Sequence, residues 1–244
     1  MKSLKKTIHA HQTELRNHRL FHALGELSTV EPLARLARGC AWLPMVFQDV
    51  LRLNLERVRG TDFERFAIHH RDEDAGHEIW FLSDLRALGV ESLGIEELFA
   101  EEFRPIRDAC YALTAEIFAV STGAQRIGFI LSLEATGHVF FENVARAVDR
   151  VCPDLPLRYF SQFHLGVEKA HDLFTEQTES DLDRIVLGEA EHAEAEELVA
   201  RTMRIFDDVF SYFADRMADE PPRASFIHEL RRVRPAPARI AYGS

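Results

Sequence analysis

The sequence predicts an all-α fold, and three observations support this. Proline and glycine fall at intervals that are too wide for β-strands and that suit long helices. No stretch shows the alternation of apolar and polar residues that marks a half-buried strand. The chain has 244 residues, 46% of them hydrophobic, which is enough for one well-buried core and short for two. We therefore expect a single seven-helix bundle over residues 1–220, followed by a tail over 221–244 that contains proline and arginine.

The positions of the breakers place the seven helices in order. Pro32 lies in the first turn of the second helix, and Gly60 and Gly89 end the second and third. Pro44 lies inside the second helix and is expected to kink it, because proline removes a backbone hydrogen bond. Pro105 interrupts the fourth helix. The expected helices span residues 3–26, 31–58, 61–89, 95–121, 124–151, 156–178 and 181–218.

The charge balance and the cysteines limit the classes of function. A formal net charge of −11 argues against a nucleic-acid partner, which needs a basic surface to replace counterions. Cys40, Cys110 and Cys152 are far apart and odd in number, so neither a disulfide framework nor a thiolate zinc site is expected. Any metal in this protein must therefore be held by imidazole and carboxylate groups, a donor set that suits iron or manganese.

No signal peptide or membrane span is expected. The N-terminal residues 1–6 are basic, but polar residues follow where a signal peptide needs an apolar segment. The most apolar region, 111–141, is interrupted by Glu116, Arg126 and Glu134. We expect a cytoplasmic protein that does not bind membranes and that acts on a small molecule. A homodimer is expected on base rates alone.

Residues 164–171 carry the clearest functional pattern. On a helix that advances about 100° per residue, His164, Glu168 and His171 share one stripe, which makes a metal-chelating face. The stretch from 70 to 77 repeats this spacing with three further candidates. These are His70, Asp74 and His77.

Glu134 is a further candidate ligand. It lies in the apolar run 129–135, where a lone carboxylate is costly to bury unless it is paired or bound to metal. Iron that activates dioxygen needs carboxylate oxygens and imidazoles, and helical bundles supply both from several helices. The alternative is that the polar run 69–74 is a solvated helix face.

Phenylalanines near these candidates are expected to form an apolar substrate pocket that excludes water. Phe47, Phe140 and Phe163 are the expected wall, together with Phe129 and Phe141. Each candidate site helix also carries a glycine beside its ligands, which either leaves room for oxygen or substrate or permits close helix packing. These glycines are Gly76, Gly137 and Gly166. Arg126 or Arg158 is a candidate for binding a substrate carboxylate, with surface ion pairing as the alternative.

Over about residues 18–178 the chain resembles the haem-oxygenase-like diiron oxidases and oxygenases. The group includes an alkene-forming fatty-acid decarboxylase and a chlamydial death-domain-associating protein. The most specific part of the resemblance is the motif of His164, Glu168 and His171. Residues 133–137, a glutamate followed by small residues, are also similar, as is Asp74-x-x-His77 running into Trp80.

The resemblance implies a haem-oxygenase-like bundle and an enzyme that activates O2 to oxidise a small organic substrate. Its cofactor would be Fe(II), with two ions per chain. One iron would be held by His77, His164 and either Asp74 or His70, and the other by Glu134, Glu168 and His171. The sequence departs from the family pattern at Phe47, where some members place a glutamate, and at His70, where others place a carboxylate. One iron or two therefore stays open.

Two other functions remain as alternatives. The same fold occurs in metal-free binding proteins and in cofactor-independent enzymes of the thiaminase or quinone-cofactor type, and the missing glutamate at Phe47 favours this group. A haem-binding oxygenase would need a proximal histidine early in the chain, for which His22 is the candidate.

Overall fold

The structure of the protein is a computed structural model that describes residues 1–61, 63–119, 122–171 and 184–219. At residues 124 and 168–171 it describes the backbone alone. The described chain is all-α and contains no strand. None of its helices is both long enough and apolar enough to cross a membrane.

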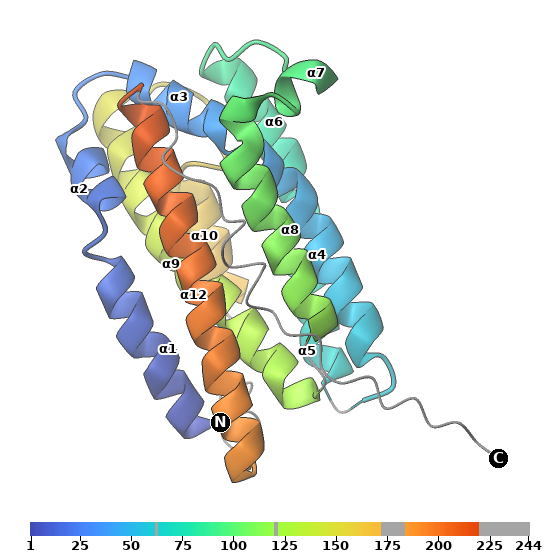
Figure 1. Ribbon diagram of the computed structural model, residues 1–244. Helices are drawn as coiled ribbons and strands as arrows, with labels where there is room; N and C mark the ends of the chain where they lie inside the picture. The colour runs from blue at the N-terminus through green and yellow to red at the C-terminus, as the bar shows by residue number, and fades with distance from the viewer. Residues whose placement is uncertain (62, 120–121, 172–183, 220–244) are drawn as a thin grey trace.

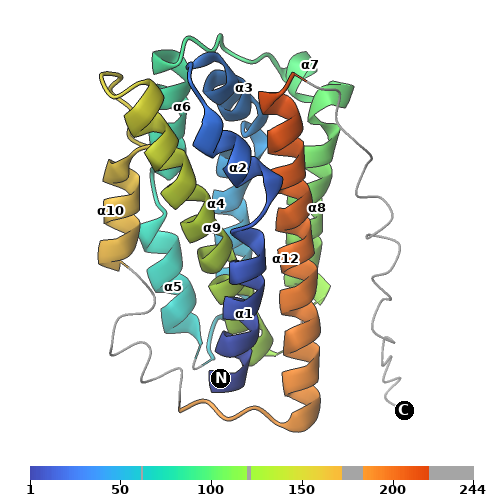
Figure 2. The same ribbon diagram turned by 90° about the vertical axis from the view of Figure 1, so that its left-hand side faces the viewer.

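Long helices run side by side along the molecule, and shorter ones cover them (Figures 1 and 2). Within this bundle α12 packs against α8 and α9, and α8 also packs against α4. The helices are α1 (Lys2–Leu15), α2 (Arg19–Glu26), α3 (Glu31–Gly39), α4 (Trp42–Val58), α5 (Glu64–Glu73), α6 (His77–Ala87), α7 (Ile95–Leu98), the 3₁₀ turn η1 (Glu101–Phe103), α8 (Arg104–Ala119), α9 (Gly123–Val151), α10 (Gln162–His171) and α12 (Glu189–Met217).

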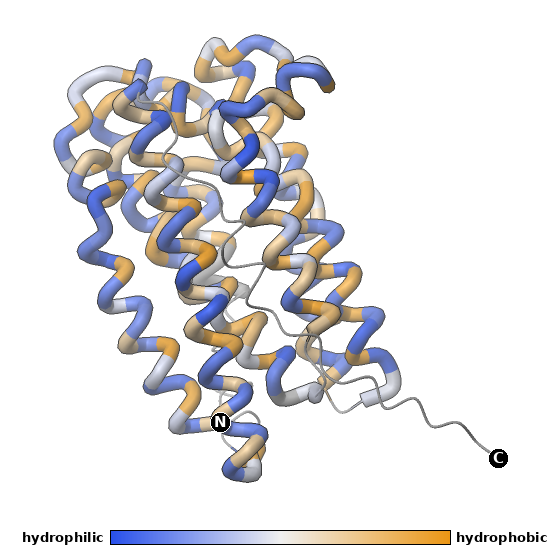
Figure 3. Tube along the Cα trace, viewed as in Figure 1, coloured by the Kyte–Doolittle hydropathy of each residue, from blue (hydrophilic) through white to orange (hydrophobic). Residues whose placement is uncertain are grey.

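The periodicity of apolar residues explains how the long helices are placed. In α12 buried residues recur every three or four positions, from Leu198 through Phe206 to Phe213, so one face of the helix is buried and the other is polar. In α9 the apolar run 129–131 is buried on consecutive positions, because α1, α10 and α12 pack around this helix. Apolar and polar stretches alternate along most helices in Figure 3. One contiguous cluster of buried apolar side chains joins α1 to α12.

Three of the expected helices are each divided in two, and the fourth is divided into α7, η1 and α8, with Pro105 in the first turn of α8 and not at the predicted interruption. The first breaks at residues 16–18, where the Nδ1 atom of His18 accepts a hydrogen bond from the backbone N–H of Leu20 at 3.1 Å and caps α2. The second breaks at residues 40–41. Pro44 therefore lies in the first turn of α4, where a missing backbone donor costs nothing, and the predicted kink at Pro44 is wrong.

The third expected helix ends at Glu73, and Asp74 follows as its C-cap. Gly76 has φ +93°, in the left-handed region that favours glycine, and α6 then begins at His77. The prediction that His70, Asp74 and His77 share one stripe of a continuous helix is therefore wrong, because they belong to two helices and the corner between them. The sixth expected helix also begins later, at Gln162.

Candidate metal centre and cavity

The corner between α5 and α6 places the carboxylate of Asp74 between two histidines. Its Oδ2 atom lies 3.2 Å from the Nε2 atom of His70, one helical turn earlier on α5. Its Oδ1 atom lies 3.0 Å from the Nδ1 atom of His77, the first residue of α6. The helix break thus aims the two carboxylate oxygens at different imidazoles.

Glu134 of α9 joins this group through His70. The Oε1 atom of Glu134 lies 2.5 Å from the Nε2 atom of His70. One donor atom from each of His70, Asp74 and Glu134 can therefore be chosen so that all three lie within 4.8 Å of one another. Glu134 is thus paired, which explains how a carboxylate is accommodated in the apolar run 129–135.

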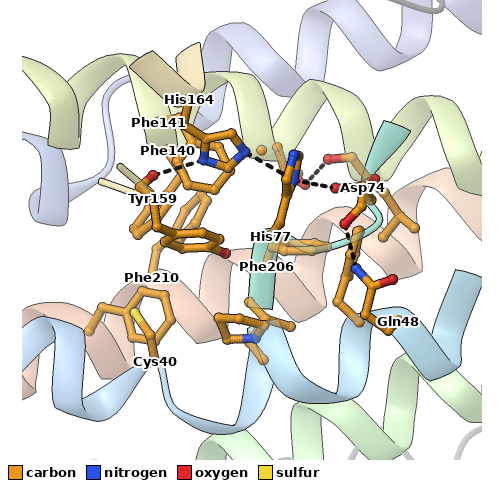
Figure 4. A pocket seen from close by; sticks show the side chains of 17 residues that line it. Cys40, Gln48, Asp74, His77, Phe140, Phe141, Tyr159, His164, Phe206 and Phe210 are labelled. Atoms are coloured by element: carbon orange, nitrogen blue, oxygen red, sulfur yellow. Dashed lines mark hydrogen bonds and ion pairs between the residues drawn. The ribbon is translucent and has the colours of Figure 1, made fainter. Parts of the chain in front are cut away.

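His164 of α10 contacts the other end of the group. Its Nδ1 atom lies 2.8 Å from the backbone oxygen of Tyr159, and its Nε2 atom lies 3.2 Å from the Nδ1 atom of His77 (Figure 4). A carbonyl oxygen can only accept, so the Nδ1 atom of His164 carries the proton and the Nε2 lone pair faces His77. The contacts run without interruption from Glu134 through His70, Asp74 and His77 to His164.

Within this series of contacts, charged neighbours stabilise the charged forms of His70 and Asp74 and so shift the pKa of each. Burial disfavours a charged imidazole at His70, but the carboxylates of Glu134 and Asp74 outweigh it and raise the pKa of His70 well above its ordinary value. Burial likewise acts against a charged Asp74, but hydrogen bonds from His70 and His77 outweigh it and lower the pKa of the Asp74 carboxyl. The site therefore holds carboxylate anions beside imidazoles, which is the donor set of a non-haem iron or manganese centre.

The spacing of the donors also fits a divalent metal ion. Two nitrogens held about 2.1 Å from one ion, at right angles to each other, lie about 3.0 Å apart. The nitrogens of His77 and His164 are separated by 3.2 Å, close to that value. His164 has the support that ligating histidines usually have, since its other nitrogen donates to a carbonyl. Among the residues that the structure describes, the buried Nδ1 atom of His70 has no such partner.

Two of the seven predicted ligands are placed by their backbone alone. Glu168 and His171 lie in the last two turns of α10, the helix that carries His164, but their side chains lie outside the described part of the structure. The predicted grouping of Glu134 with these two residues therefore stays a prediction. Among the described side chains, Glu134 instead contacts His70.

An apolar cavity of about 80 Å³ lies beside the histidines. In Figure 4 Asp74 and Gln48 lie toward one end of the cavity, and Cys40 and Phe210 toward the other. His77 and His164 also line it. Six phenylalanines from α4, α9 and α12 are part of the wall, and these are Phe47, Phe140, Phe141, Phe206, Phe210 and Phe213. The cavity thus joins an apolar interior to the imidazole and carboxylate groups.

The predicted pocket residues divide into two groups. Phe47, Phe140 and Phe141 line the cavity. Phe163 lies outside the lining and is 47% exposed, because the first turn of α10 directs it toward Trp80, with ring centroids 5.4 Å apart. Phe129 is buried in the core and also lies outside the lining.

The predicted glycines and arginines have different roles. Gly137 lines the cavity, and a Cβ atom there would meet only the Phe141 ring, at 4.0 Å. Among the described residues, a Cβ atom at Gly76 or at Gly166 would meet no other atom within 4 Å, so close packing against the described helices explains none of the three glycines. Arg158 lies over the rings of Trp80 and Phe163, and Arg126 donates to the backbone oxygen of Ile117. Neither arginine lines the cavity.

Phe47 stands where some members of the haem-oxygenase-like diiron group place a glutamate, and its neighbours Gln48 and Asp49 are the polar residues that could take the place of that glutamate. The Phe47 ring lies against His70, with ring centroids 6.2 Å apart. The side-chain amide of Gln48 donates to the backbone oxygen of Asp74 at 2.7 Å, so Gln48 braces the corner that carries the ligands. Asp49 is exposed and pairs with Arg52. His22 is exposed and lies outside the cavity, so no observation favours it as a haem ligand.

Sequence reasoning missed several residues of the site. Tyr159 lines the cavity and supports His164 through its backbone, a role that no side-chain pattern reveals. Cys40 reaches the cavity because α3 ends beside it, and the aromatic residues of α12 reach it because that helix packs against α9. The spacing of the apolar residues of α12 identifies its buried face but not what that face covers.

Comparison with known proteins adds no identification. The sequence matches no protein-family model, and it has no significant match among curated proteins.

Proposed function

We propose that the protein is a non-haem iron oxidase or oxygenase that activates O2 to oxidise a small organic substrate, on a helical bundle of haem-oxygenase-like type. The observation that carries the proposal is the partly buried carboxylate of Asp74, shared between the buried His70 and His77 at the polar edge of an apolar cavity. Carboxylate and imidazole ligands on several helices of a bundle are typical of iron centres that react with dioxygen.

Contacts among the described residues support a set of iron ligands for this proposal. His77, His164 and Asp74 would form one set of ligands, and His70 and Glu134 a second, with Glu168 and His171 as the remaining candidates on α10. Bound Fe(II) would supply the redox chemistry through which dioxygen is reduced. One oxygen of the Asp74 carboxylate lies beside His77 of the first set and the other lies beside His70 of the second. This arrangement favours two ions over one.

The chain's own groups would bind the substrate and exclude water. Phe140, Phe206 and Phe210 offer an apolar surface, so the substrate would carry an apolar part of modest size. As an oxidase, the enzyme would pass two electrons and two protons from the substrate to O2, which leaves as hydrogen peroxide. As an oxygenase, it would place one oxygen atom in the substrate, release the other as water and require a two-electron reductant.

Anaerobic loading with Fe(II), followed by elemental analysis, tests this proposal. We expect about two irons per chain in the wild-type protein. A His164→Gln, Glu134→Gln double variant should lose this iron, whereas His22→Gln, at an exposed histidine, should retain it. Exposure of the loaded protein to O2 should then produce a transient visible absorption band. No bound iron under any loading condition would overturn the proposal.

A second function has its own support. The side-chain contacts run at hydrogen-bond distance from Glu134 through His70, Asp74 and His77 to His164, as they would in a proton-transferring or ligand-binding chain. A metal-free binding protein or a cofactor-independent enzyme would use this arrangement as it stands. Tight binding of an apolar ligand by protein that takes up no iron would favour this second function.

A further inference from the structure

A buried carboxylate lies close to the candidate metal centre but outside its ligands. Asp84, two helical turns after His77 on α6, has no exposed surface. Its Oδ1 atom accepts a hydrogen bond from the backbone N–H of Arg158 at 2.8 Å, and its Oδ2 atom accepts one from the backbone N–H of Phe160 at 3.0 Å. Asp84 thus holds the segment that connects α9 to α10.

One peptide group of that segment connects Asp84 to His164. The N–H of Phe160 and the carbonyl of Tyr159 belong to the same peptide bond. The N–H donates to the carboxylate of Asp84, and the carbonyl accepts the Nδ1 proton of His164 at 2.8 Å. The three groups therefore lie in series, from carboxylate through peptide to imidazole.

This order of groups has a definite electrostatic effect. A carboxylate at the N–H end of a peptide draws the peptide proton and increases the negative charge on the carbonyl oxygen at the other end. Hydrogen bonds in such a chain strengthen one another, by about 10–30% per bond in condensed-phase estimates. The carbonyl of Tyr159 is thus a stronger acceptor, and His164 is held with its proton on Nδ1 and its Nε2 atom directed at His77.

The cost of burial supports a specific role for Asp84. A buried carboxylate is unfavourable unless it is fully hydrogen-bonded, and a neutral acceptor would hold a connecting segment at lower cost. In ligating histidines the N–H of the second ring nitrogen commonly donates a hydrogen bond to a carboxylate or to a backbone carbonyl, which fixes the tautomer and raises the basicity of the ligand. Here the carboxylate acts through the carbonyl.

We propose that Asp84 is a positioning residue for His164, acting through the peptide bond between Tyr159 and Phe160. It keeps His164 in the Nδ1–H tautomer and presents the Nε2 lone pair to the metal. The effect on the metal rests on the proposed function, but the effect on the tautomer does not.

Asp84→Asn tests the proposal, with Asp215→Asn as the matched control. The control removes another almost fully buried carboxylate, which pairs with Arg19 on α2. Nitrogen-15 NMR of the metal-free, full-length proteins reports the tautomer of His164, whose signals are assigned with His164→Gln. We expect a single Nδ1–H tautomer in the wild type and in Asp215→Asn, and a shifted or mixed tautomer in Asp84→Asn. Unchanged His164 signals in a folded Asp84→Asn variant would overturn the proposal.

Metal affinity provides the second measurement. Loss of such a support typically lowers metal affinity about 10–100-fold, and we expect a loss of this size for Fe(II) in Asp84→Asn but not in Asp215→Asn. If the wild-type protein binds no iron, the proposed function fails while the NMR measurement still decides the role of Asp84. If Asp84→Asn does not fold, the wild-type spectrum decides it, because a proton on Nε2 of His164 contradicts the proposal.

Discussion

Asp74 ends α5, and its carboxylate reaches one histidine on each side of the corner that follows. The Gln48 amide holds the backbone oxygen of the same residue, so both the chain and the side chain of Asp74 are fixed. The sequence pattern alone predicted that Asp74 accompanies His70 and His77. The three residues lie together for another reason than the predicted continuous helix, because Asp74 lies one turn after His70 and the corner spans only three residues before His77. The pattern could not predict the partner of Glu134, which depends on how α5 and α9 pack.

Asp74→Asn should destabilise the protein. The substitution keeps the size of the side chain but replaces one charged acceptor with an amide donor, which leaves a buried histidine facing a like donor. Hydrogen bonds to charged groups contribute about 1.5–3 kcal/mol, so we expect the free energy of unfolding to fall by about that amount. Urea titration measures it. Asp49→Asn, at an exposed residue, should change the value by less than about 0.5 kcal/mol. Equal stabilities for the two variants would contradict the role of Asp74.

At the scale of the elements, the all-α class could be predicted from the spacing of breakers, but the divisions within the helices could not. In the sequence, Gly76 indicates open space or close packing beside the candidate ligands, whereas in the structure its backbone conformation divides α5 from α6. Residues 40–41, where the second expected helix breaks, contain neither proline nor glycine that would predict a break. Pro44 is compatible with the first turn of a helix as well as with a kink inside one. Local sequence determines where a helix can begin or end, and packing in the bundle determines which of these positions are used.

Gly76→Ala tests the importance of this corner. A Cβ atom at Gly76 meets no other atom within 4 Å in the described part of the chain, so the expected cost arises from the backbone at φ +93°. A left-handed conformation costs a residue other than glycine about 1–2 kcal/mol. We therefore expect a loss of about that size in the free energy of unfolding. Gly166→Ala, in the regular helix α10 with equally open space, should stabilise the protein by about 0.5–1 kcal/mol. Chemical denaturation of both variants checks the opposite signs.

At the scale of the whole molecule, the bundle brings together segments far apart in the sequence around one cavity. Tyr159 comes from the segment between α9 and α10, His164 from the first turn of α10, Cys40 from the end of α3, and Phe210 from α12. A single sequence shows which residues each helix buries, but not which helices are neighbours. This is why Phe140 could be predicted for the pocket wall while Phe210 could not.

Gly137→Val should separate the stability of the bundle from the use of its cavity. Gly137 lines the cavity within α9, where glycine is unfavourable for a helix, and only the Phe141 ring lies near the added atoms. Valine should therefore fill part of the empty space without loss of stability. Xenon enters dry apolar cavities, so ¹²⁹Xe NMR should show binding to the wild-type protein and weaker or no binding to this variant. Gly166→Val, at an exposed position on α10, is the control and should bind xenon as the wild type does. If Gly137→Val folds and binds xenon like the wild type, the cavity is not where an apolar substrate would bind.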